Sequence, residues 1–104
     1  MPSARRGEIW VVDLGYLGKV RPCLVLSIEP EASDRALVTL IPHTTSPRGT
    51  RFEVDTSSSF LKPGAFDCQN PITAPRAKLI RYLGALTADQ MSRMEDSVRF
   101  WLGI

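Results

Sequence analysis

The chain has 104 residues, of which 43% are hydrophobic and 23% are charged. This composition is typical of an ordinary globular protein, and the length suits one domain, so we expect residues 1–104 to fold around a single core. A net charge of +2 is too small for a protein that coats nucleic acid nonspecifically.

The sequence contains no apolar run long enough to span a bilayer. Its first six residues, MPSARR, lack the apolar stretch of a secretory signal. We therefore expect a cytoplasmic protein without membrane association.

Several segments of strand length are rich in β-branched and aromatic residues and are separated by turn signals. The clearest are 8–14, 22–28, 36–41 and 51–55. Pro42 is expected to end the third strand, and two further strands are predicted at 65–69 and 77–83, with a helical turn at 57–62. Short antiparallel strands at this spacing predict a strongly bent β-sheet or small barrel.

The C-terminal segment has the pattern of an amphipathic helix. Thr87 and Gln90 fit a capping box, which predicts that the helix begins there. Apolar residues then recur at helical spacing, at Met91, Met94, Val98, Trp101 and Leu102. We expect this stripe, including Trp101, to pack on the core, as Trp10 does from the first strand.

Most familiar catalytic motifs are missing. The sequence has no phosphate-binding loop, no G-x-S-x-G and no H-E-x-x-H, and the single His43 cannot supply a multi-histidine metal site. Cys23 and Cys68 lack metal-ligand spacing and are interpreted as buried free thiols. We expect neither a metal nor a cofactor.

Polar residues instead gather at the predicted strand ends. Arg21 precedes Pro22, residues 43–46 read HTTS after the third strand, and 67–70 read DCQN along the fifth. A guanidinium and hydroxyl groups can together surround a phosphate. The alternative is a solvated arginine and an ordinary turn.

Three blocks of the sequence carry a more specific signal. RGEIWVVDLG, GKVRPCLVLS and LIPHTTSPRGTRFEVD resemble, in that order and with similar separations, the signature blocks of the MazF/PemK toxin family. The resemblance implies an SH3-like barrel of the plasmid-maintenance-toxin type, usually a homodimer with RNA in a groove across the interface. It also implies a metal-independent, sequence-selective endoribonuclease, the toxin of a type II toxin-antitoxin system, held in check by an acidic, flexible, MazE-like antitoxin segment.

The resemblance places the family's catalytic arginine on Arg21 and its catalytic threonine on Thr44. The ribose 2′-OH of single-stranded RNA would attack the neighbouring phosphate, giving 2′,3′-cyclic phosphate and 5′-OH ends, while Arg21 stabilises the developing charge. The expected RNA-binding residues are Lys19, Thr45, Ser46, Arg48, Asp67 and Gln69.

The chain departs from the family pattern where acid and base groups are expected. Its first loop is short, and relatives place an arginine and an aspartate where Asp67 and Gln69 flank Cys68. The general base is therefore unassigned. Asp67 is one candidate, and His43 is another, although strand alternation favours the face opposite Thr44.

Two further questions stay open at the level of sequence. Tyr16 and Phe52 are candidate stacking platforms for RNA bases. The same barrel could instead inhibit a protein target such as DNA gyrase without cutting RNA, or serve as an SH3-like adaptor.

Overall fold

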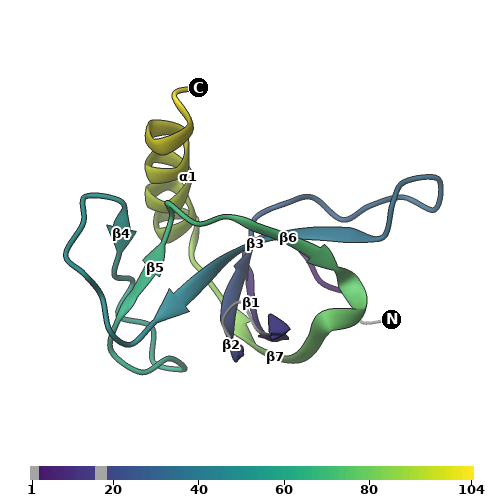
Figure 1. The fold of residues 1–104 in the computed structure, drawn as a ribbon, viewed down its shortest axis with the longest axis horizontal. Helices are drawn as coiled ribbons and strands as arrows, with labels where there is room; N and C mark the ends of the chain where they lie inside the picture. Colours follow the sequence, from purple (N-terminus) through teal and green to yellow (C-terminus); the bar gives the residue numbers. More distant parts are fainter. Residues whose placement is uncertain (1–2, 16–18) are drawn as a thin grey trace.

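The computed structural model describes residues 3–15 and 19–104, which form one curved β-sheet and a C-terminal helix (Figure 1). The strands are β1 (Glu8–Asp13), β2 (Val20–Val25), β3 (Leu37–Thr44), β4 (Glu53–Val54), β5 (Ala65–Asp67), β6 (Ile72–Pro75) and β7 (Leu79–Ala85). A 3-10 turn, η2 (Arg76–Lys78), joins β6 to β7, and α1 spans Ala88–Leu102.

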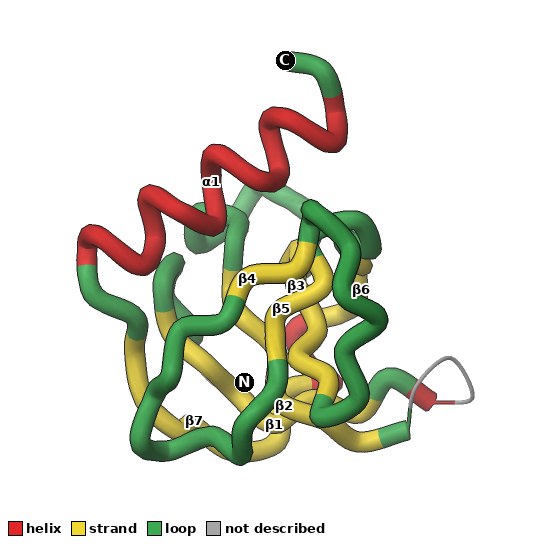
Figure 2. The backbone as a smooth tube through the Cα atoms, turned by 90° about the vertical axis from the view of Figure 1, so that its left-hand side faces the viewer, coloured by secondary structure: helices red, strands yellow, loops and turns green. Residues whose placement is uncertain are grey.

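Strand β3 organises the sheet. The strand order is β4-β5-β3-β2-β1-β7, and β6 also pairs with β3 (Figure 2). The first half of β3 pairs with β6, and its last residues, His43 and Thr44, pair with β5. Two register shifts between β1 and β7 bend the sheet further. The predicted fold class is confirmed, although the described strands form an open, barrel-like sheet because β6 and β7 do not pair.

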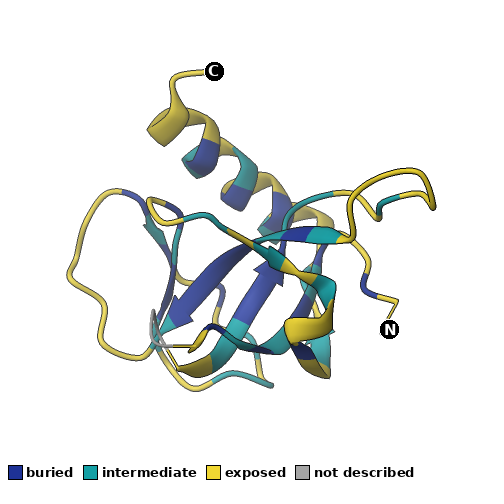
Figure 3. Cartoon of the chain, turned by 45° about the vertical axis from the view of Figure 1, so that its right-hand side comes forward, coloured by how far each residue is buried: buried dark blue, intermediate teal, exposed yellow. Residues whose placement is uncertain are grey.

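Apolar side chains form two clusters on the two sides of the sheet. One includes Ile9 and Phe66 of the sheet and Met94 of α1. Figure 3 shows buried segments both in the helix and in the strands. The other, which includes Val12 and Leu79, fills the inside of the curved strands. Both cysteines are buried and free, as predicted.

The predicted capping box is present at the start of α1. The Gln90 amide donates to Thr87 Oγ1 at 3.2 Å, and the Thr87 amide donates to Gln90 Oε1 at 2.8 Å. Met91, Met94 and Val98 are buried as expected. The core positions predicted for Trp101 and Leu102 are wrong, because these residues, in the last turn of the helix, are 42% and 52% exposed.

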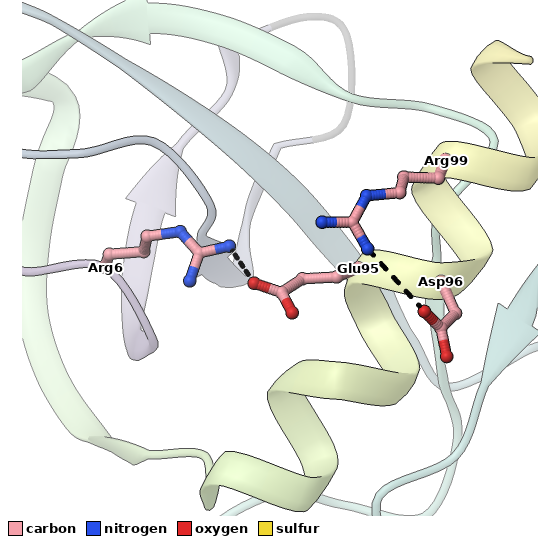
Figure 4. A network of polar contacts seen from close by, with 4 residues as sticks. All are labelled: Arg6, Glu95, Asp96 and Arg99. Atoms are coloured by element: carbon pink, nitrogen blue, oxygen red, sulfur yellow. Dashed lines mark hydrogen bonds and ion pairs between the residues drawn. The ribbon is translucent and has the colours of Figure 1, made fainter. Parts of the chain in front are cut away.

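An ion pair joins the N-terminal segment to the helix. Arg6 contacts Glu95 of the helix (Figure 4). Within the helix, Arg99 contacts Asp96, three residues before it, at 3.8 Å. Pairs this exposed typically contribute about 0–1 kcal/mol each. The helix is therefore held mainly by its buried methionines and Val98.

The structure corrects several strand boundaries. Strand β3 continues through Pro42 to Thr44, and β6 was not predicted. Strand β7 begins at Leu79, because η2 occupies the preceding three residues. The helical turn expected at 57–62 is an irregular loop with one turn, closed by the Leu61 amide on the Ser58 carbonyl at 3.2 Å. No helix among the described residues is long and apolar enough to cross a membrane.

Candidate functional site

Two neighbouring strands bring the predicted catalytic pair together. Cys23 of β2 pairs with Pro42 of β3 in antiparallel register. Continuing that register by two residues sets Arg21 opposite Thr44, and both residues lie within their strands. Their proximity thus follows from strand pairing rather than from loop conformation.

Arg21 and Thr44 lie where two surface hollows meet. The basic hollow, of about 630 Å³, is lined by Val11, Lys19, Val20, Arg21, Pro22, His43, Thr44, Thr45, Ser46, Phe60, Leu61, Lys62, Arg81 and Leu83. The polar hollow, of about 520 Å³, is lined by Arg21, Pro42, Thr44, Ser46, Arg48, Thr50, Glu53, Asp67, Gln69 and Asn70. Only Arg21, Thr44 and Ser46 line both.

The two expected catalytic residues and the six expected RNA-binding residues each line at least one of these hollows. Lys19 and Thr45 line the basic hollow, whereas Arg48, Asp67 and Gln69 line the polar hollow. The structure therefore gathers residues from β2, β3, β5 and three loops on one continuous surface. Their individual roles in binding remain predictions.

The loop after β3 is held by side chains facing its backbone. The Ser46 amide donates to Thr44 Oγ1 at 3.1 Å, which leaves the hydroxyl hydrogen of Thr44 available to donate to a ligand oxygen. The Glu53 carboxylate accepts from the amides of Arg48 at 2.9 Å and Thr50 at 2.8 Å. These hydrogen bonds lower the pKa of the Glu53 carboxyl below its ordinary value, and the bond from the Arg48 amide has the larger effect.

His43 lies behind the predicted catalytic pair, Arg21 and Thr44. Its side chain is buried, and its ring meets Phe66 edge to face at 5.0 Å, on the core side. Burial lowers the pKa of His43, partly opposed by Asp55 and reinforced by Arg21. The residue also borders a smaller cavity of about 240 Å³ beneath the β4–β5 loop.

Sequence reasoning missed two cations in the basic hollow. Lys62 comes from the β4–β5 loop and Arg81 from β7, and both line the hollow that contains Arg21. Neither residue stands in a motif. The pairing of β7 with β1 and the path of the loop were the information needed to place them.

The aromatic candidates have different outcomes. Phe52 is only 6% exposed, because its ring packs against Phe100 and Trp101 with centroids 5.3 Å apart in each case, so the expected stacking role is wrong. Tyr16 lies outside the described residues. Trp10 packs against the core inside the curved strands, as predicted.

The described residues contain no group of three His, Cys, Asp or Glu arranged to hold a metal.

Comparison with known proteins identifies the class to which this fold and site belong. The model of the PemK-like, MazF-like toxin of type II toxin-antitoxin systems matches residues 5–102. The chain belongs to this family.

Individual relatives agree with this assignment. The chain is 32% identical over 89 residues to the endoribonuclease MazF3 of Mycobacterium tuberculosis, covering 84% of this chain and 86% of the relative. It is 28% identical over 107 residues to a probable endoribonuclease MazF of Mycolicibacterium smegmatis, covering 96% and 97%.

Solved structures show the same fold. A mycobacterial endoribonuclease in complex with its cognate antitoxin superposes with a TM-score of 0.83 at 27% identity, covering 97% of this chain and 96% of the other. MazF from Deinococcus radiodurans gives a TM-score of 0.85 at 20% identity with full coverage of both chains, a likeness that concerns the fold alone.

Proposed function

We propose that the protein is the endoribonuclease toxin of a type II toxin-antitoxin system and that it cleaves single-stranded RNA in a sequence-selective manner. The observation that supports this most strongly is the position of Arg21 and Thr44, on adjacent strands at the junction of two hollows. A strand of RNA that crosses this junction has its scissile phosphate between a permanent cation and a hydroxyl donor.

In the proposed reaction the ribose 2′-oxygen attacks the adjacent phosphorus and the bond to the 5′-oxygen breaks. A general base takes the proton of the 2′-hydroxyl, and a general acid, which can be a solvent water, protonates the departing 5′-oxygen. The products are a 2′,3′-cyclic phosphate and a 5′-hydroxyl. Arg21 stabilises the charge that grows on the phosphoryl oxygens, so the reaction needs no metal for this step.

Thr44 positions the phosphate in this scheme. Its oxygen accepts from the Ser46 amide, and this bond orients the hydroxyl so that its hydrogen can point to a phosphoryl oxygen. Holding the reacting groups in line is itself a large part of the barrier reduction in such a reaction.

The two hollows suit different parts of the substrate. Lys19 and Arg48 supply charge for the RNA backbone, one in each hollow, and Thr45 and Ser46 add hydroxyl donors between them. Asp67 and Gln69 in the polar hollow carry the acceptors and donors that base edges require. We assign sequence selectivity to this side.

A comparison of RNA with DNA tests the proposed chemistry. Because the nucleophile is the ribose 2′-hydroxyl, the purified protein is expected to cut a mixed-sequence RNA and leave the DNA strand of the same sequence intact. Cleavage of both strands would refute 2′-hydroxyl attack, and cleavage of neither would refute the nuclease assignment.

The same surface is the proposed site of inhibition in the cytoplasm. An acidic, flexible antitoxin segment can occupy the hollows and exclude RNA, since its charge is complementary to Arg21 and Lys19. If saturating cognate antitoxin left the affinity for a non-cleavable RNA unchanged, the proposal that the antitoxin occupies the hollows would have to be abandoned.

We also propose that the protein is a homodimer, which would extend the RNA groove across two copies.

A further inference from the structure

The basic hollow extends beyond the residues that the proposed reaction uses. Its far side carries Lys62 and Arg81, both exposed. Arg81 pairs with Val11 across β7 and β1, and Val11 pairs with Pro22 across β1 and β2. Residues paired in this way share a face of the sheet, so Arg81 lies two strands away from the residue that follows Arg21.

The charged side chains that line this hollow are all cations. They are Lys19, Arg21, Lys62 and Arg81. Within the described part of the chain, the ion pairs join Arg6 to Glu95 and Arg99 to Asp96, so neither Lys62 nor Arg81 is neutralised by a carboxylate. The polar hollow differs, because Glu53 and Asp67 contribute carboxylates there. A second phosphate is therefore favoured on the basic side of Arg21.

Between these cations the hollow has an apolar floor. It is formed by Val11, Pro22, Phe60, Leu61 and Leu83. Phe60 is half-buried and lies against the backbone of β7, since a Cβ atom on Gly84 would stand only 2.6 Å from its ring. Glycine at this position lets the ring rest on the strand beside Leu83. An aromatic ring among aliphatic side chains is a surface on which an unpaired base can stack.

We propose that this side of the basic hollow is a second nucleotide subsite, in which Lys62 and Arg81 bind the phosphate next to the scissile one and the base packs on Phe60 and Leu83. This inference rests on the proposed ribonuclease function and adds residues that position a longer substrate. Alternating charge and apolar surface matches the alternation of phosphate and base along a single strand. The subsite binds substrate and takes no part in bond breaking.

The test uses four variants and a matched control. Lys62→Ala, Arg81→Ala and the double variant remove charge, Phe60→Leu removes the ring while keeping apolar volume, and Arg35→Ala removes an exposed charge from the loop between β2 and β3. Binding of a short, mixed-sequence 2′-O-methyl RNA is measured over a series of salt concentrations. Cleavage of the unmodified RNA gives kcat and KM for each variant.

Loss of the subsite phosphate in the double variant is expected to reduce the slope of log affinity against log salt by about 0.7, and each single variant should reduce it by less, because both cations bind the same phosphate. Phe60→Leu should weaken binding by roughly tenfold without changing the slope, because stacking involves no counterion release. For all four variants KM should rise while kcat stays near the wild-type value, and Arg35→Ala should match wild type.

Three results would overturn the subsite. The first is a slope of log RNA affinity against log salt that is the same in the Lys62→Ala/Arg81→Ala variant as in wild type, while wild type still binds and cuts RNA. The second is unchanged RNA affinity in that variant together with weaker binding of a glutamate-rich peptide, which would assign the surface to a protein partner. The third is wild-type protein that neither binds nor cuts RNA, a result that would refute the proposed function as well and is recognised without any variant.

Discussion

Gly64 lies so close to the end of β3 that a Cβ atom at position 64 would stand 2.0 Å from the carbonyl oxygen of Thr44. The same atom would lie 3.0 Å from Cε1 of His43. The β4–β5 loop therefore meets the backbone of the proposed catalytic threonine directly. This contact links the loop that carries Phe60 and Lys62 to the site of the proposed reaction.

We expect Gly64→Ala to lower both stability and activity. The obstacle is a backbone oxygen in a paired strand, so either β3 or the loop has to move, and such overpacking typically costs about 1–3 kcal/mol. Thermal unfolding and kcat measured together check this. Gly84→Ala is the comparison, since its methyl group meets the half-buried Phe60 ring, which can shift more easily. Equal, small effects in both variants would contradict the interpretation of the Gly64 contact.

Arg21→Ala is expected to reduce kcat for RNA cleavage by at least about a hundredfold, the usual effect of removing a donor to developing negative charge. The unfolding midpoint should change little, because Arg21 is only half-buried at a strand end. Arg21→Lys should recover part of the rate, since it keeps the charge and loses the planar fork. A near-wild-type rate for Arg21→Ala would remove this residue from the mechanism.

Stability should fall as the pH is lowered because of His43. Burial lowers the pKa of His43 below its ordinary value of 6.5, so the unfolded chain takes up the proton more readily than the folded protein. The stability that neutral, buried His43 contributes to the folded protein is fully present above pH 6.5. It is lost as the pH falls through the lowered pKa that His43 has in the folded state. His43 is the single histidine. The unfolding midpoint of His43→Gln should therefore depend less on pH than that of wild type between neutral and mildly acidic pH; an identical profile would contradict this assignment.

The two cysteines should be unreactive in the folded protein. Burial raises the pKa of Cys23 to about 12 and that of Cys68 to about 11. At pH 8 both are thiols, and the thiolate is the reactive form. Iodoacetamide should label neither residue until denaturant is added, as mass spectrometry can show. Rapid labelling of the native protein would mean that the core opens around one of them.

The sequence was most informative where local chemistry decides the structure. Thr87 and Gln90 predicted the start of α1 because capping depends on residues three apart. Pro42 was wrongly predicted to end the third strand, because proline is usually absent from the middle of a central strand. Strand β3 instead continues through it. The short β6 was missed because four residues are too few to stand out as a strand, and the segment becomes a strand by pairing with β3.

The same distinction applies to the site. Arg21 and Thr44 were found through a family resemblance carried by contiguous blocks of sequence. Lys62 and Arg81 lie outside those blocks, and they meet only through strand pairing and the path of a loop. Trp101 fitted the helical stripe, but periodicity does not report where the sheet beneath the helix ends.

The most direct test of the central claim is cleavage of a mixed-sequence RNA in excess EDTA by wild type and Arg21→Ala, followed by analysis of the new ends. Wild type is expected to cut without divalent metal and to leave 2′,3′-cyclic phosphate and 5′-hydroxyl ends, whereas Arg21→Ala should yield almost no product. Cleavage that disappears in EDTA and returns with magnesium, or products with 5′-phosphate ends, would contradict the claim.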